Sequence, residues 1–191
     1  YNDPDLGAGV TVLMRYTLRL LNKQQFERAS ILICACELIR KNEINNYGKI
    51  RITNGIWMGR SMTPNNISTQ ISDYQDFINS VDNKRQPNEY KNSPPLLSCP
   101  CCGNRLIREN EKNEVIGRWG YIRPRGKYNS APGSKVPFSI VCTNSKCEFY
   151  TTEINFSIDK TIPVLEVDEI IYKERPSLLF STVDKFVTLA W

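Results

Sequence analysis

Residues 10–41, VTVLMRYTLRLLNKQQFERASILICACELIRK, decide the fold. Val10 to Met14 form a short, largely β-branched apolar run, which is typical of a strand buried on both faces in a parallel sheet. A long helix is predicted to follow, beginning between Thr17 and Asn22 and ending near Lys41. A strand that leads directly into a helix indicates an α/β layer.

The predicted helix has one polar stripe and is apolar over most of its remaining surface. A helix of this kind is expected to be sandwiched inside a core, and Cys36 is placed in that core. The stripe at helical spacing consists of Glu27, Ser30, Cys34, Glu37 and Lys41.

Further along the chain, the pattern continues with a second strand over residues 50–58, which contains an internal glycine, and a helix over residues 69–81. A polar linker leads into a cysteine-rich segment, and a third buried strand over 178–180 precedes a helix that starts near Asp184. The predicted fold is therefore an α/β, partial parallel sheet interrupted by a small β-rich module. The predicted domain boundaries are 1–95, 96–150 and 151–191.

The cysteine-rich segment contains two cysteine pairs. Cys99 and Cys102 form a C-x-x-C followed by Gly103, and Cys142 and Cys147 are separated by four residues. This spacing is typical of a zinc ribbon, in which four thiolates bind one Zn²⁺ at about 2.3 Å. Free or buried cysteines are the less favoured alternative.

Two features refine the predicted zinc module. The 39 residues between the pairs exceed the usual spacing, so an additional hairpin is expected there. Because four thiolates leave no open coordination position, the zinc is expected to be structural. Cys101, between two ligands, is expected to point away from the metal.

The excess positive charge lies in the same segment. Residues 99–147 contain nine Lys or Arg and three Glu, a net charge of +6, whereas the whole chain carries +5. Within it, Arg123, Arg125 and Lys127 alternate with aromatic residues, as in surfaces that bind single-stranded nucleic acid. Two alternatives stay open at this point: cations that are simply solvated, and aromatic side chains that form the core of a small module.

Other classes of protein are disfavoured by what the 191 residues lack. There is no histidine, which excludes Ser-His-Asp and Cys-His catalysis by this chain. There is neither an apolar run of the roughly 20 residues needed to cross a membrane nor a signal-peptide pattern, so a cytoplasmic protein without a membrane partner is expected.

Two strand-to-helix junctions are candidates for anion binding. One contains Arg15, Thr17 and Arg19, and the other contains Thr182 and Lys185. In a parallel sheet both junctions lie at the carboxyl edge, where helix N–H groups, hydroxyls and cations can hold successive phosphates of a nucleic acid. The alternative is that each threonine only caps its helix.

Three segments closely resemble large superfamily 2 helicases of the type found in the DISARM anti-phage defence system. The segments are VTVLMRYTLRLLNKQQFERA, GIWMGRSMTPN and RPSLLFSTVDKFVTLAW. In that family RYTLRLL resembles motif Ia and STVDKF resembles motif Ib of the first RecA-like motor domain, with a cysteine module inserted between them. The resemblance implies DNA-backbone contacts by the five junction residues, and it implies other subunits of a defence complex as partners.

The chain departs from a complete motor. It contains no G-x-x-x-x-G-K-[ST] phosphate-binding loop. The run Val164 to Glu169 resembles an acidic ATPase motif, but Glu166 interrupts it, and Asp168 and Glu169 are interpreted as exposed charges before the last strand. The chain alone is therefore expected not to be an enzyme, and ATP and Mg²⁺ are cofactors of the parent protein only. A stand-alone zinc-ribbon module, for nucleic acid or for protein interaction, is the alternative.

Overall fold

The computed structural model describes residues 9–16, 19–59, 63–83, 94–112, 114–124, 136–183 and 185. They divide into two compact units. Unit 1 comprises residues 1–65 and 163–191, and unit 2 comprises residues 66–162. Unit 2 is thus larger than the cysteine segment outlined on the sequence, because it also takes in the helix before that segment and the residues after it.

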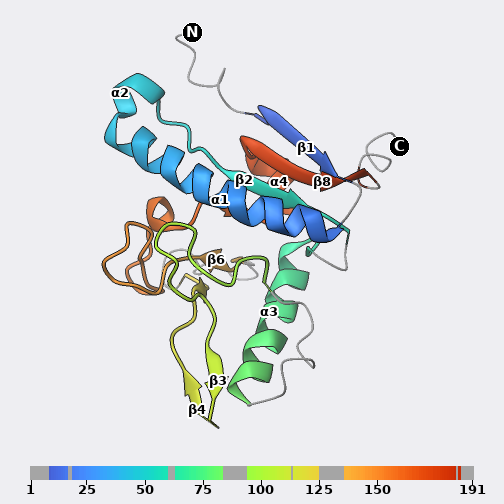
Figure 1. The fold of residues 1–191 in the computed structure, drawn as a ribbon, viewed down its shortest axis with the longest axis vertical. Coiled ribbons are helices and arrows are strands. Elements are labelled where there is room, and N and C mark those ends of the chain that lie inside the picture. The colour runs from blue at the N-terminus through green and yellow to red at the C-terminus, as the bar shows by residue number, and fades with distance from the viewer. Residues whose placement is uncertain are drawn as a thin grey trace. The chain divides into compact units, whose positions relative to one another are not determined.

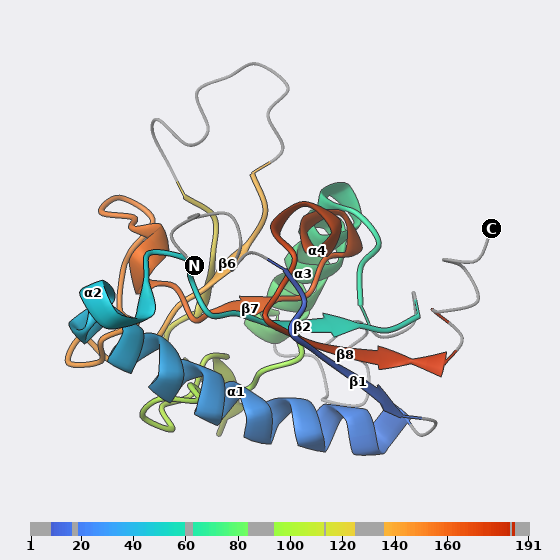
Figure 2. The same ribbon diagram turned by 90° about the horizontal axis from the view of Figure 1, so that it is seen from above.

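Unit 1 is an α/β layer built on a parallel sheet. Its strands are β1 (Val12–Tyr16), β2 (Asn54–Trp57), β7 (Val164–Leu165) and β8 (Leu178–Thr182), in the order β1-β8-β2-β7. All three pairings are parallel, which confirms the predicted sheet type. Helix α1 (Arg19–Asn42) covers one face and α4 (Asp168–Glu174) lies on the other (Figures 1 and 2). A short helix, α2 (Ile44–Tyr47), follows α1.

Helix α1 has the predicted extent, but the side it buries includes most of the polar stripe as well as the apolar Phe26 and Ile33. Ser30, Cys34 and Glu37, which belong to the polar stripe, are all buried, whereas Ile31 and Leu32 are exposed. Polar side chains can face the sheet because they find hydrogen-bond partners there. For example, the Asn54 amide of β2 donates to Ser30 Oγ over 2.9 Å. Cys34 rather than Cys36 is therefore the fully buried cysteine of α1.

The central strands β2 and β8 are buried, as predicted for β8, but β1 is not. β2 is buried along its whole length, and Phe180 of β8 packs edge-on against Phe26 of α1 with ring centroids 6.0 Å apart. By contrast, Val12 and Leu13 of β1 are about half exposed. An apolar sequence shows what a strand can bury; it does not show whether a neighbouring element is there to cover it.

The glycine inside β2 is required by close packing. A Cβ atom at Gly55 would lie 2.5 Å from Pro176 Cγ and 2.9 Å from Leu179 Cδ1. Real Cβ atoms do not approach other atoms so closely, so a side chain at this position would push β8 away from β2. Gly55 thus allows β2 and β8 to pair at the centre of the sheet.

Unit 2 consists of helix α3 (Ile67–Asp82) and two small antiparallel ribbons. The ribbons are β3 (Glu109–Glu111) with β4 (Glu114–Ile116), and β5 (Tyr121–Ile122) with β6 (Ser139–Ile140). The β3–β4 hairpin lies between the cysteine pairs, where an additional hairpin was expected. α3 begins at Ile67 because the side chain of Asn66 caps it by accepting from the Thr69 N–H at 2.9 Å.

The aromatic side chains of unit 2 form its core. Tyr74 of α3 packs edge-on against Tyr121 and Phe138, with ring centroids 5.2 and 5.6 Å apart. Phe77 packs against Trp119 at 5.9 Å. The Gln70 side chain adds hydrogen bonds to the backbone N–H and C=O of Phe138. The structure therefore favours the alternative of an aromatic core over the predicted surface on which nucleic-acid bases would stack.

Candidate functional site

The four predicted metal ligands meet at one point of unit 2. The sulfur atoms of Cys99, Cys102, Cys142 and Cys147 all lie within 4.8 Å of one another. The Cys99 and Cys147 sulfurs are 3.9 Å apart, and those of Cys102 and Cys142 are 3.4 Å apart. None of the four is in a disulfide. Cys101 is exposed and is not one of the four, although burial and the neighbouring Cys147 thiol raise its pKa.

Tight turns hold each cysteine pair. In the first turn, the Cys99 N–H donates to Asn104 O and the Gly103 N–H donates to Cys99 O, both over 2.8 Å. Gly103 has a φ of +74°, a left-handed conformation that glycine adopts without steric cost. In the second turn, the Cys147 N–H donates to Asn144 O over 3.0 Å. The Asn144 N–H in turn points at the Cys142 sulfur, 3.4 Å away.

Burial, backbone N–H groups and neighbouring thiols set the electrostatics of the cluster. Burial raises the pKa of the Cys99 thiol to about 12, although the backbone N–H groups of Cys102 and Cys101 oppose the shift. Burial also raises the pKa of Cys142. Burial acts in the same direction on Cys102, but the Asn104 N–H and the neighbouring thiols outweigh it and lower its pKa. A bound cation would have to displace thiol protons.

The arrangement fits a tetrahedral metal site. Four sulfurs at about 2.3 Å from one ion would be about 3.8 Å from each other, and the two close sulfur pairs lie near that separation. Two of the four side chains, Cys99 and Cys142, are buried, and the turn N–H groups point at sulfur. The four-cysteine cluster is therefore compatible with zinc.

The second candidate site lies in unit 1, at the carboxyl edge of the sheet. β1 and β8 are neighbours in parallel register, with Arg15 opposite Ser181 and Tyr16 opposite Thr182. The two junctions singled out on the sequence thus begin side by side. Arg15 is exposed, whereas Thr182 is buried. Thr17 and the side chain of Arg19 lie outside the described residues, as does the helix predicted beyond Asp184.

Lys185 is held in an ion pair at this edge. Its Nζ lies 2.5 Å from Asp168 Oδ2, with both side chains largely buried, and it also lies 5.6 Å from the centroid of the Trp57 ring. Burial raises the pKa of Asp168, even though the hydrogen bond and charge of Lys185 act to lower it. Lys185 therefore contacts a carboxylate of its own unit in this structure.

The interpretation of Asp168 as an exposed charge is wrong. Asp168 is 6% exposed, Glu166 is also buried, and Val164–Leu165 is itself the strand β7. Asp168 begins helix α4, and its partner Lys185 also lies over the ring of Trp57, the last residue of β2. Sequence reasoning missed the pairing of Asp168 with Lys185, although one signal was present. Asp168 follows the apolar strand β7 and Lys185 follows the apolar strand β8, and the carboxyl ends of parallel strands meet at one edge of the sheet.

The remaining predicted nucleic-acid residues belong to unit 2. Arg123 is half-buried, its Nε donates to Val136 O over 3.0 Å, and its guanidinium lies 6.0 Å from the Phe138 ring centroid. It therefore supports the core of the unit. Arg125 and Lys127 lie outside the described residues.

The fold and the site define a class: an α/β protein with a parallel sheet and a four-cysteine module. No protein-family model matches the chain. The chain is similar to the DISARM protein DrmA of Bacillus paralicheniformis, with 34% identity over 185 residues, or 96% of this chain. It is thus related to a DISARM protein, and it spans 14% of the length of that relative. Among the described residues, no helix has the length and apolar character needed to cross a membrane.

Proposed function

We propose that this chain is part of an ATP-dependent DNA helicase or translocase of an anti-phage defence system. Unit 1 would contribute part of a RecA-like motor domain, and its sheet edge would contact the DNA backbone. One observation carries the proposal: the two motif-bearing strands β1 and β8 are adjacent, parallel and in register, with Tyr16 opposite Thr182. The similarity to a DISARM protein supports the same assignment.

The chemistry of the edge suits a phosphate backbone. Arg15 is exposed and free to reach a phosphate, and both strands end where the chain turns toward a helix. Phosphate contacts of this kind position a protein on nucleic acid without reading its sequence. A translocase needs such contacts, because it must move along any sequence.

ATP hydrolysis is assigned to the longer protein. The 191 residues contain no phosphate-binding loop motif, so binding of ATP and Mg²⁺ would rest on other segments of that protein. The chain itself would act as a nucleic-acid-contacting part of the motor and not as an enzyme.

We assign a structural zinc ion to the four cysteines of unit 2. The ion would supply the positive charge that gathers four thiolates, and the turns around Gly103 and Asn144 would orient the sulfurs. Because Trp119 and Tyr121 pack in the core, their rings favour a folded scaffold over a base-stacking surface.

A second role for unit 2 is docking of another subunit of the defence complex. Ile154 is 82% exposed, and Ile158 is exposed nearby in the sequence. Such a contact would be largely apolar and would depend little on salt, whereas DNA binding weakens steeply as salt rises.

DNA binding by the longer protein tests the main proposal. Arg15→Ala should weaken binding and reduce the slope of log affinity against log salt by about 0.9, the value for one phosphate contact on duplex DNA. Lys160→Ala is the matched control, because it also removes one exposed positive charge but lies in unit 2. Equal slopes for both variants and the parent protein would contradict the proposed edge.

A further inference from the structure

The four clustered cysteines of unit 2 come from two separate turns. Cys99 and Cys102 belong to the first turn, and Cys142 and Cys147 belong to the second. Thiolates repel each other, so a metal ion binds more tightly when the protein already holds the two turns at the right separation. Any contact that joins the turns directly is therefore a candidate determinant of metal affinity.

Two side chains, Asn104 of the first turn and Thr143 of the second, join the turns directly, and we call this pair the clasp. Asn104 Nδ2 donates to Thr143 Oγ1, and Thr143 Oγ1 donates to the backbone carbonyl of Arg105 over 2.7 Å. The Thr143 hydroxyl thus bonds to two consecutive residues of the other turn. Serine carries the same hydroxyl group, whereas valine has nearly the shape of threonine and no hydroxyl.

The clasp lies next to two of the sulfur atoms. The backbone N–H of Asn104 hydrogen-bonds to the Cys102 sulfur, and Thr143 directly follows Cys142. The Cys102 and Cys142 sulfurs are 3.4 Å apart, whereas the other close pair is separated by 3.9 Å. The clasp therefore flanks the closer of the two sulfur pairs that span the turns.

Burial restricts only part of the cluster. Cys99 and Cys142 are 2% and 1% exposed, so core packing restricts their side chains, whereas Cys102 is exposed. An exposed side chain loses rotamer freedom when it binds a metal ion, and this loss weakens binding. At Cys102 the structure provides hydrogen bonds through Asn104 in place of packing.

We propose that Asn104 and Thr143 are positioning residues for the metal ion. They hold Cys102 and Cys142 together across the two turns and thereby increase the zinc affinity of the cluster. The inference rests on the zinc assignment made above and extends it to residues that are not ligands. Hydrogen-bonding partners outside a ligand set typically contribute about 10–100-fold to metal affinity. Thr143 contributes more than Asn104, because its hydroxyl makes both bonds.

Competition for zinc against a chromophoric chelator measures the affinity of the chain of residues 1–191. Thr143→Val should lower this affinity by about 10–100-fold, because both hydrogen bonds of the clasp are lost. Thr143→Ser should keep the parent affinity, because the serine hydroxyl restores both bonds. Equal affinities for the Thr143→Val variant and the parent chain would overturn the inference.

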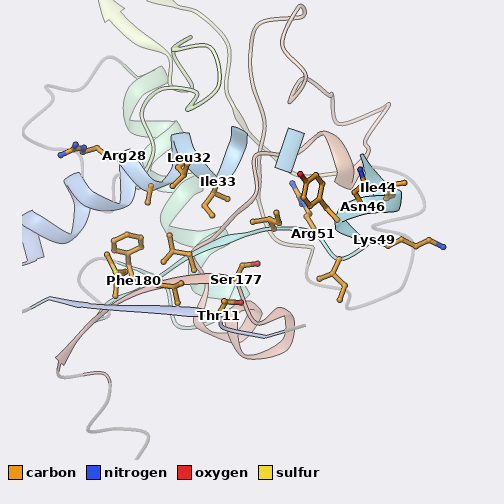
Figure 3. Close-up of a pocket in the computed structure, with 18 of the residues that line it drawn as sticks. Thr11, Arg28, Leu32, Ile33, Ile44, Asn46, Lys49, Arg51, Ser177 and Phe180 are labelled. Carbon is orange, nitrogen blue, oxygen red and sulfur yellow. The ribbon is translucent and has the colours of Figure 1, made fainter. Parts of the chain in front are cut away.

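Two other threonines provide matched controls for the change from threonine to valine. Thr152 lies in the same unit, is half-buried, and accepts from the Asn155 N–H over 3.2 Å. Thr11 belongs to unit 1, where it lines the groove between helix α1 and the strands β1 and β8 (Figure 3). Thr152→Val and Thr11→Val should both keep the parent zinc affinity. If Thr152→Val weakens binding as much as Thr143→Val does, the inference is overturned, because any lost hydroxyl in unit 2 would then have the same effect.

Asn104→Ala tests the clasp without a change in the core, because Asn104 is exposed. Alone, it should lower the zinc affinity by a smaller factor than Thr143→Val. Added to Thr143→Val, it should cause no further loss, because the Asn104 side chain acts through the Thr143 hydroxyl. Losses of affinity that multiply in the double variant would contradict the clasp.

The absorption of bound Co²⁺ separates positioning from a general destabilisation of unit 2. The visible bands of Co²⁺ depend on the geometry of the four thiolates. At saturating metal they should therefore change in Thr143→Val and stay as in the parent in Thr143→Ser and Thr152→Val. A weakened affinity with an unchanged spectrum would overturn the positioning role.

These measurements also separate this inference from the zinc assignment on which it rests. A parent chain that binds no metal would overturn both. A parent chain that binds zinc, with Thr143→Val binding it equally well, would overturn the positioning role alone.

Discussion

Glu37 shows how a single residue fixes the orientation of α1. It is fully buried, it accepts two hydrogen bonds from the Arg40 guanidinium at 2.7 and 2.8 Å, and it accepts a third from the Ile52 N–H at 3.0 Å. Arg40 in turn donates to Gly48 O over 3.0 Å. These hydrogen bonds connect the end of α1 to the segment that leads into β2. They also explain why a carboxylate can be buried on the side of α1 that faces the sheet.

Glu37→Gln should therefore destabilise unit 1 by about 3–5 kcal/mol, because it leaves the buried Arg40 without its counter-charge. Burial acts to raise the pKa of Glu37, but the Arg40 hydrogen bonds and charge and the Ile52 N–H outweigh it and lower the pKa below 4.5. The stability from Glu37 is thus present above pH 4.5 and is lost as the pH falls through the lower folded-state pKa. Denaturant unfolding as a function of pH measures both effects.

The exposed Glu43→Gln provides the control, since Glu43 is engaged with Asn46 on the surface. If both variants lose the same small amount of stability, the buried cluster does not hold α1.

The Lys185–Asp168 pair makes a second prediction at the residue scale. Lys185→Met should destabilise unit 1 by about 3–5 kcal/mol, because Asp168 would remain as a buried carboxylate without its cation. The pKa of Asp168 is already raised by burial, so the variant should regain stability as the pH falls and the carboxyl group becomes neutral. Thermal unfolding across pH measures this dependence.

Adding Asp168→Asn to Lys185→Met should recover part of the loss, because an amide needs no counter-charge. Losses that simply add in the double variant would show that the two side chains do not interact. Reduced DNA binding by Lys185→Met alone would therefore not identify a phosphate contact.

At the scale of elements, unit 2 depends on the close approach of three backbone segments, at Leu106, Gly120 and Val141. The Gly120 N–H donates to Leu106 O, and the Val141 N–H donates to Gly120 O, both over 2.7 Å. A Cβ atom at Gly120 would lie 2.7 Å from Val141 O and 2.8 Å from Leu106 Cδ2. Because Val141 directly precedes Cys142, these backbone hydrogen bonds set the position of the second cysteine pair relative to the first.

Gly120→Ala should destabilise unit 2 by about 1–3 kcal/mol, because the backbone carbonyl of Val141 cannot move aside as a flexible side chain could. Differential scanning calorimetry of the metal-loaded protein gives the change. Gly59→Ala is the control, since its Cβ would meet no atom within 4 Å. A Gly120→Ala variant as stable as the control would contradict this close approach.

On the scale of the whole molecule, the two units should respond differently to metal. Cys102→Ala should abolish zinc retention and unfold unit 2, because apparent binding energies of about 10–16 kcal/mol in zinc peptides exceed what a small core supplies. Unit 1, with its own sheet and helix α1, should remain folded. Elemental analysis, thiol titration and hydrogen exchange of α1 measure these outcomes.

Cys101→Ala is the matched control, because Cys101 lies between Cys99 and Cys102 in the sequence but is exposed and is not one of the four clustered cysteines. Loss of protection in α1 together with unit 2 in the Cys102→Ala variant would show that the units do not fold separately. Retention of one zinc by Cys102→Ala would contradict the four-cysteine assignment.

Local chemistry made part of this molecule predictable from its sequence. Ligand spacing and turn residues are short-range properties, so the sequence alone groups Cys99, Cys102, Cys142 and Cys147, and it also predicts the parallel sheet and the extents of α1 and α3. The geometry of the four sulfurs bears out the grouping, while the identity of the metal stays a prediction.

What the sequence determined by itself was therefore the α/β class, the order of the longer elements along the chain and the cysteine cluster, whereas α2, β7 and α4 were not predicted. The tertiary structure alone decided which face of α1 is buried, that β1 is an edge strand among the described strands, and that Lys185 meets Asp168. The physical reason is that burial and pairing depend on partners distant in sequence. Glu37 is buried because Arg40 and the Ile52 N–H donate hydrogen bonds to its carboxylate there. Val12 stays exposed because no described strand lies beside β1 on its outer side.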